Sequence, residues 1–248
     1  MGHPRSLFSL PALALVSSLA FVVAPALAGP NAGGFLLFHT NDALSYTWDD
    51  IEDYSYFTVP ECGYGHCNEI DECMGFVSNI DPTSDRSGNV PTVFWLLAVF
   101  PPESCPRLRA ASFGLDWDMA YTPTFIGWGN CAAGELAEDG WPEEPNAGTS
   151  IWFSSTETRQ VVPLYWFAAF SYYGSTQISV SSRSGASAPE FADDSVPSII
   201  DLVPREYRGV FGLGGGQGTN PLWSNTPVLE DSWGGIKRRF ADRAARNE

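Results

Sequence analysis

Hydrophobic and polar residues alternate over several short stretches of this chain, and this pattern predicts β-strands with one face in a core. Residues 111–118 show it most clearly. The apolar face would hold Ala111, Phe113, Leu115 and Trp117, and the opposite face Ser112, Gly114, Asp116 and Asp118. Residues 176–182 follow the same period of two, with Ile178 and Val180 on the apolar side. This period is typical of a strand, because its successive side chains point to opposite faces of the sheet.

Two longer stretches, residues 93–100 and 161–173, are apolar at nearly every position and predict central strands that are buried on both faces. Shorter apolar runs at 35–39, 124–128 and 150–154 predict three further strands, and Tyr173-Gly174-Ser175 predicts a hairpin turn. Helical periodicity is almost absent before the C-terminus. The expected fold class is therefore all-β: an antiparallel β-sandwich or jelly-roll-like domain with long loops and a short C-terminal helix.

The chain begins with the pattern of a cleavable signal peptide at residues 1–28. Arg5 precedes an apolar run at 7–23, and Ala26-Leu27-Ala28 gives the small-x-small pattern at which signal peptidase cuts. A retained membrane anchor is the alternative, but the apolar run is short for a span and contains serines. We therefore expect a secreted, extracytoplasmic or cell-surface protein. Its expected parts are a β-sandwich domain at 29–205, a Gly/Pro-rich linker at 206–230 and a basic tail at 231–248.

The tail predicts a short amphipathic helix. Trp233, Ile236 and Phe240 fall at helical spacing, and Lys237 begins a series of basic residues that covers the other faces. A basic amphipathic helix can contact an anionic membrane surface or serve as an address that export machinery reads. The alternative is an end without fixed structure, because so short a helix is marginal in water.

Charge and aromatic content restrict the kind of partner. The net charge is −16, which argues against nucleic acid, because binding nucleic acid requires a basic surface. Aromatic residues beside loops can stack on sugar rings. The candidates for such a surface are Trp128, Trp141, Trp152, Tyr172 and Tyr173. The alternative for each is a place in the hydrophobic core. A cell-surface glycan or a protein is accordingly the expected partner.

The cysteines point to disulfide bonds, since an exported protein meets an oxidising compartment. The candidates are Cys62, Cys67, Cys73, Cys105 and Cys131. We expect one bridge within residues 62–73 and consider a second between Cys105 and Cys131, while the odd number leaves one thiol over. Zinc at the 62–73 cluster, with His66 as a further ligand, is the alternative. Its spacing does not match a paired Cys-x2-Cys ribbon.

Acidic turns favour a structural calcium ion over any other cofactor. Asp81, Asp85 and Asn89 offer oxygen ligands on one turn, and Asp193 and Asp194 offer them on another. Neither turn carries the full EF-hand pattern, so ordinary solvated turns are the alternative.

No catalytic residue is assigned from the sequence. The chain after residue 28 has two histidines, His39 and His66, and no Gly-x-Ser-x-Gly elbow. We expect His39 to be a hydrogen-bonded residue at a strand end. Asp116 and Asp118 would lie on one strand face with Cα atoms roughly 7 Å apart, a separation within the range of glycosidase carboxyls.

Several stretches together resemble a group of secreted β-rich proteins from uncultured bacteria. They are Leu37–Tyr46, Gly140-Trp141-Pro142, Tyr165–Ala168 with Tyr172-Tyr173-Gly174, Phe191–Pro197 and the ending Ser232–Lys237. The resemblance implies export and a surface or extracellular role. It brings no activity and no catalytic residue.

These observations together favour a secreted or cell-surface binding or structural module without catalysis. A carbohydrate-active hydrolase that uses acidic residues is the alternative. A concave cleft with converging carboxylates would favour the hydrolase, and a flat aromatic face would favour the module.

Overall fold

The computed structural model describes residues 28–56, 74–101 and 104–221. Most of the expected signal peptide, Cys62, Cys67, Cys73 and the tail at 231–248 lie outside the described residues. The strands are β1 (Phe35–Thr40), β2 (Thr92–Val99), β3 (Leu108–Asp116), β4 (Thr124–Asn130), β5 (Gly134–Ala137), β6 (Gly148–Glu157), β7 (Val161–Phe170), β8 (Thr176–Ser181), β9 (Glu190–Ala192), β10 (Ile200–Leu202) and β11 (Val210–Leu213). The helices are α1 (Ile51–Ser55) and α2 (Met74–Val77), with 3-10 turns η1 (Trp48–Asp50), η2 (Met119–Tyr121) and η3 (Arg205–Tyr207).

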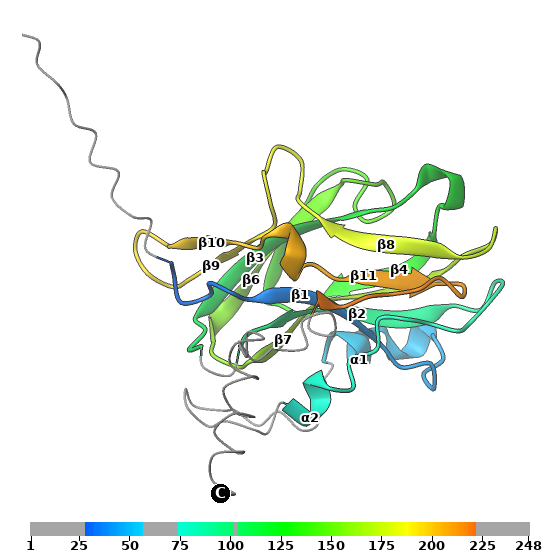
Figure 1. Ribbon diagram of the computed structural model, residues 1–248, viewed down its shortest axis with the longest axis horizontal. Coiled ribbons are helices and arrows are strands. Elements are labelled where there is room, and N and C mark those ends of the chain that lie inside the picture. The colour runs from blue at the N-terminus through cyan, green and yellow to red at the C-terminus, as the bar shows by residue number, and fades with distance from the viewer. Residues whose placement is uncertain (1–27, 57–73, 102–103, 222–248) are drawn as a thin grey trace, which may run out of the picture.

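The strands form two antiparallel sheets. Sheet A has the order β1-β2-β7-β4, and sheet B contains β10-β9-β3-β6-β5. Strand β8 also pairs with the second half of β3, and β11 pairs with β8 (Figure 1). The inner faces of the two sheets share one hydrophobic core. The expected all-β antiparallel sandwich is confirmed.

The alternating strand places its side chains as its sequence predicts. Ala111, Phe113 and Leu115 of β3 are buried in the core between the sheets. Strand β3 ends at Asp116, two residues earlier than the alternation indicates, and Asp118 instead caps η2 by accepting a hydrogen bond from Ala120 N–H. Asp116 and Asp118 are therefore neighbours in a strand-to-turn connection rather than along one strand.

Sheet A is covered on both faces. Helices α1 and α2 lie against its outer face (Figure 1), where they and neighbouring residues build a second hydrophobic cluster. Trp95 Nε1 donates to Tyr54 O at 2.9 Å, and Trp166 Nε1 donates to Ser55 Oγ at 3.0 Å. These two bonds fix α1 on β2 and β7. The double coverage explains why both strands are apolar at almost every position, as expected from their sequence.

The described part of the expected linker is not a linker. Residues 210–213 form β11, and Phe211 stacks on Phe94 in the core with ring centroids 4.1 Å apart. Glycine-rich composition predicts a linker without packing, but these glycines allow the backbone of this segment to pack closely. A Cβ on Gly212 would lie 2.0 Å from Gly216 O. The segment thus packs by backbone contact where apolar side chains are few.

Residue Asn220 closes the outer edge of β1. Its side chain accepts a hydrogen bond from Phe38 N–H at 3.2 Å and donates one to Phe38 O at 2.9 Å. Gly209 N–H donates to Leu36 O at 2.7 Å on the same edge. The edge strand therefore has its backbone groups satisfied by the C-terminal segment, which limits pairing with other chains.

The bridge considered between Cys105 and Cys131 is not formed. Cys131 is a free thiol that packs against the outer cluster of sheet A, while Cys105 lies exposed in the segment before β3. Burial raises the pKa of the Cys131 thiol far above its ordinary value. The spacing of two cysteines in sequence carried no information on which layer each would occupy.

Candidate functional site

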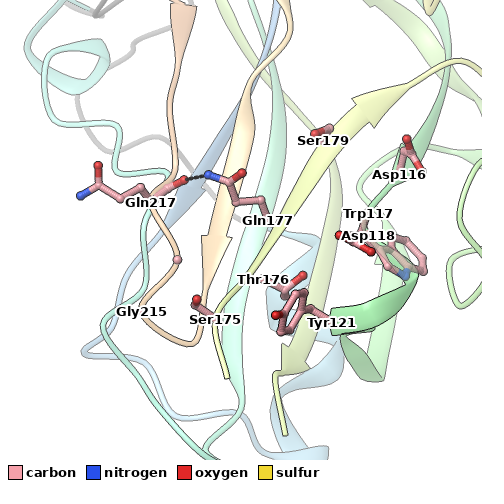
Figure 2. Close-up of a pocket in the computed structure, with 11 residues that line it drawn as sticks. Asp116, Trp117, Asp118, Tyr121, Ser175, Thr176, Gln177, Ser179, Gly215 and Gln217 are labelled. Atoms are coloured by element: carbon pink, nitrogen blue, oxygen red, sulfur yellow. Dashed lines mark hydrogen bonds between the residues drawn. The ribbon is translucent and has the colours of Figure 1, made fainter. Parts of the chain in front are cut away.

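The main candidate site is a cleft of about 550 Å³ on the outer side of sheet B. Strand β8, the end of β3, the turn η2 and the glycine-rich loop after β11 surround it. Its lining consists of Asp116, Trp117, Asp118, Tyr121, Ser175, Thr176, Gln177, Ser179, Gly215, Gly216 and Gln217 (Figure 2). The cleft lies where β3 stops at Asp116, opposite Ser179, and the chain turns away through η2, so the first residues of β8 have no β3 partner on that edge.

The two sides of the cleft carry different chemistry. Figure 2 shows Asp116, Trp117 and Asp118 together on one side, and Gln177 and Gln217 on the other. Gln177 Nε2 donates to Gln217 O at 2.6 Å, so the amide side is held in place. Asp116 accepts a hydrogen bond from Asn146 Nδ2 at 3.2 Å. One wall is thus anionic and accepting, and the other presents neutral amides that both donate and accept.

Two buried polar atoms beside the cleft lack partners. Trp117 and Thr176 are 6% and 4% exposed. Among the described residues, Trp117 Nε1 and Thr176 Oγ1 are the only buried side-chain nitrogen or oxygen atoms without a hydrogen bond. Buried polar groups are nearly always hydrogen-bonded, and an orphaned one costs roughly 1–3 kcal/mol. Both atoms belong to residues that line this one cleft, but each atom has an exposed area below 1 Å² and lies beneath the cleft surface.

Aromatic side chains lie at the margin of the cleft. Tyr121 is exposed and lines it directly. Tyr172 and Tyr173 are also exposed and contact each other edge to face, on the turn that leads into Ser175. The Ser171 hydroxyl donates to Gly174 O within this turn, which is the hairpin that the sequence predicts between β7 and β8.

The five aromatic residues proposed from the sequence do not form one surface. Trp141 is buried, and its Nε1 donates to Tyr165 Oη at 3.0 Å inside the core. Trp128 lies on the edge strand β4 of sheet A, and Trp152 lies on β6 of sheet B. Only Tyr172 and Tyr173 lie near the cleft. The prediction missed Trp117 and Tyr121 as cleft residues, because the alternation of residues 111–118 does not reveal that β3 ends at Asp116 and that η2 follows.

Sheet B also has an outer face without a layer of its own chain over it in the described residues. One row of paired residues crosses five strands: Ile200, Ala192, Ala110, Trp152 and Gly134. The next row contains Leu202 and Leu136 at its two ends. The Trp152 indole is 47% exposed and lies over Gly134, where a Cβ would be 2.2 Å from Trp152 Cζ2. This surface, called here the open face, has exposed apolar side chains at its margins and Glu190, Ser112 and Ser150 between the two leucines.

The acidic turns are engaged by protein groups. Asp193 accepts hydrogen bonds from the Ser195 hydroxyl and from Ile199 N–H, which lower the pKa of its carboxyl. The Arg107 guanidinium, 2.7 Å from Asp194, and a bond from Thr156 Oγ1 lower the pKa of Asp194 to about 2.

Calcium therefore stays a prediction. Asp81 accepts from Thr83 N–H, and Asp85 and Asn89 lie exposed on the same turn. Across residues 28–56, 74–101 and 104–221, no three His, Cys, Asp or Glu side chains are grouped so as to hold a metal ion. In the same residues, no helix has the length and hydrophobicity to cross a membrane.

Comparison with solved structures gives distant likenesses. These structural neighbours are cohesin modules. The module from a family 33 glycoside hydrolase of Clostridium perfringens ATCC13124 is 4% identical over 54% of this chain and 89% of that chain, with a TM-score of 0.40. The sixth cohesin of Acetivibrio cellulolyticus scaffoldin B, solved in complex with a dockerin, is 13% identical over 53% and 94%, with a TM-score of 0.35. A type II cohesin domain from the cellulosome of the same organism is 9% identical over 56% and 82%, with a TM-score of 0.32.

The cohesin likeness carries no argument about a ligand at these identities and TM-scores. No family model matches the sequence, and no curated protein sequence matches it.

Proposed function

We propose that the chain is a non-catalytic binding module and that its cleft binds a hydroxyl-rich ligand, a saccharide. The observation that carries the proposal is the lining of the cleft, in which Asp116 and Asp118 lie opposite Gln177 and beside the exposed Tyr121. These groups fit sugar hydroxyls, because carboxylates accept hydrogen bonds and an amide both donates and accepts them.

Each of these groups has a counterpart on a sugar ring. The Asp116 and Asp118 carboxylates accept hydrogen bonds from hydroxyl groups, and the Gln177 amide can do both. The exposed Tyr121 ring offers an apolar face for the C–H side of a sugar ring. A pocket with a few convergent polar groups and an aromatic surface is the usual form of a small-ligand site.

The arrangement of the carboxylates favours binding over hydrolysis. Glycosidase carboxyls flank the scissile bond from two sides. Here Asp116 and Asp118 share one side of the cleft and face the glutamines (Figure 2). Asp118 is also engaged in capping η2. Because a concave cleft is also the feature expected of a hydrolase, the binding experiment must include an assay for cleaved saccharide.

A saccharide titration tests the proposal. Calorimetry with a panel of neutral and acidic oligosaccharides should find a binder. Asp116→Asn should weaken its binding about tenfold or more, as expected for loss of a hydrogen bond to a charged group. Tyr121→Ala should also weaken binding. Tyr56→Ala is the control, because Tyr56 is also an exposed tyrosine but follows α1 on the other sheet. Absence of any binder would refute the proposal, and release of product would replace it with hydrolysis.

Export completes the proposal. Cleavage after Ala28 would make Gly29 the first residue, and Gly29 N lies 2.7 Å from Asp201 Oδ1. The new α-ammonium group would then face a carboxylate, which favours the processed end in that position. Mass spectrometry of the protein from culture medium should find Gly29 at its N-terminus. A product that keeps residues 1–28 would refute export by this route.

Protein docking on the open face is the second candidate function. The specific observation is the exposed Ile200, Leu202, Trp152 and Leu136 around small residues on a sheet without its own cover in the described residues. Exposed apolar patches of this kind commonly mark interaction sites. A photo-crosslinking residue at 152 should capture a defined partner, and Ile200→Asp should abolish that capture. A crosslinker at Val196, exposed elsewhere, is the control. Equal capture from 152 and 196 would refute docking on this face.

A further inference from the structure

A second hollow adjoins the cleft on the same outer surface. Its volume is about 400 Å³, and it is lined by Asp116, Ser179, Val180, Ser181, Ser182, Arg205, Arg208, Gly209 and Val210. Asp116 and Ser179 line both hollows, and they are paired across β3 and β8. The two hollows are therefore parts of one groove that crosses these strands.

The second hollow brings together two arginines without an acidic partner at ion-pair distance. Four ion pairs occur in the described residues, and they involve Arg86, Arg107, Arg159 and Arg183. Arg205 and Arg208 take part in none of them. Arg109 on β3 also lacks such a pair, but Arg205 and Arg208 are the two that line one hollow together.

Arg208 is held ready for a ligand. Its Nε and Nη2 both donate to Val203 O, at 3.0 and 2.8 Å, so the guanidinium is fixed in the hollow. Burial and the nearby Arg205 lower the pKa of Arg208, while Glu206 beside them raises it. Two like charges in one hollow repel each other, and an anion between them would remove that repulsion.

We propose that the groove binds an acidic saccharide whose anionic group lies between Arg205 and Arg208 while its neutral hydroxyls fill the cleft. The proposal rests on saccharide binding in the cleft and names the class of sugar. Arginine recognises carboxylate and sulfate oxygens through paired N–H donors. Ser181 and Ser182 line the same hollow, and the Ser181 hydroxyl donates to Ser182 O at 3.4 Å.

Asp116 sets the direction of the bound ligand. It lies between the arginines and the rest of the cleft, since it lines both hollows. An anionic group beside Asp116 would be repelled, whereas a hydroxyl would donate to it. The ligand must therefore place its charge at the arginine end and its hydroxyls along Asp116 and the glutamine side.

The test compares a sugar acid with its own neutral ester. The probes are oligogalacturonate, its methyl ester, and a sulfated galactan oligosaccharide. Each is titrated into the processed protein, which begins at Gly29. The acid should bind about tenfold or more tightly than the ester. Arg205→Gln should remove this preference while it leaves ester binding unchanged. Arg159→Gln, which alters an ion-paired arginine outside the groove, is the matched control. Tighter binding of the sulfated probe than of the acid would assign the hollow to sulfate.

Failure of this inference differs from failure of the proposed function. Equal binding of acid and ester, with no effect of Arg205→Gln, would overturn the anion site and leave the saccharide cleft standing. Absence of binding by every probe would overturn both. Arg208→Lys is the second variant. Because the Arg208 side chain also bonds the backbone at Val203, the melting temperature of this variant is measured together with its binding. A loss of acid preference at unchanged melting temperature supports the proposal.

Discussion

Lowering the pH from 7 to 4.5 should destabilise the sandwich through His39. This residue lies near the end of β1, where its Nδ1 accepts a hydrogen bond from Asp81 N–H at 3.2 Å and its ring contacts Phe76 edge to face. Burial lowers the pKa of His39 from 6.5 to about 4, and the nearby Asp81 carboxylate offsets only part of that effect. The native state therefore holds His39 neutral over most of this pH range.

The sign and size follow from proton linkage. Between pH 6.5 and 4 the unfolded chain binds a proton at His39 that the folded chain does not, so stability falls as the pH falls. The pKa of His39 is 6.5 in the unfolded chain and about 4 in the folded chain. At about 1.4 kcal/mol for each pKa unit, this difference lowers the free energy of unfolding by roughly 3 kcal/mol once the pH is below both pKa values. Roughly 2 kcal/mol of this loss falls between pH 7 and 4.5.

Urea unfolding at half-unit steps from pH 7 to 4.5 measures this loss. The window stops at 4.5 because the Asp193 and Asp194 carboxyls have lowered pKa values and titrate below it. His39→Asn is the control, since the asparagine oxygen can still accept the hydrogen bond from Asp81 N–H but does not titrate. The free energy of unfolding of this variant should depend less on pH by roughly 2 kcal/mol over the window. Equal losses in the wild type and the variant would refute the reasoning.

Three other perturbations test the packing. Asn220→Asp replaces the donor to Phe38 O with an acceptor. Urea unfolding should show that the free energy of unfolding falls by roughly 2–4 kcal/mol. An unchanged free energy would mean that other groups bond the backbone of β1 at this edge. Trp141→Phe removes the bond to the buried Tyr165 hydroxyl and should cost roughly 1–3 kcal/mol by the same measurement; an unchanged free energy would contradict its core position. Cys131 should resist alkylation at pH 8 until urea unfolds the chain, as read by peptide mass mapping, and rapid modification of the native protein would contradict its burial.

The sequence pattern predicts the strands whose side chains obey a simple period. Strands β2, β3, β7 and β8 were expected within a few residues of their observed ends, because burial on one or both faces determines their composition. The short strands β5, β9, β10 and β11 were missed. They are three or four residues long, and their pairing depends on neighbours far away in the chain.

The cleft was predictable only in part. Asp116 and Asp118 were singled out together, and both line it. Their opposite wall comes from Gln177 and Gln217, which local pattern cannot connect with them. Of the two arginines of the second hollow, Arg208 belongs to the stretch 206–230 that its composition assigned to a linker, and Arg205 is the last residue of the predicted domain. Trp141 shows the opposite error, since a tryptophan in a Gly- and acid-rich loop indicates exposure, yet the loop folds back and buries it.

The Asn220 contact has a mechanical consequence. A pull on the chain beyond residue 221 would load the two hydrogen bonds between the Asn220 side chain and Phe38 before it reached the paired strands of sheet A. These bonds join residues that are 182 positions apart, so they transfer tension from the C-terminal end directly to the first strand. If the basic tail fastens the protein to a surface, Asn220 is the side chain at which that load would enter the folded domain.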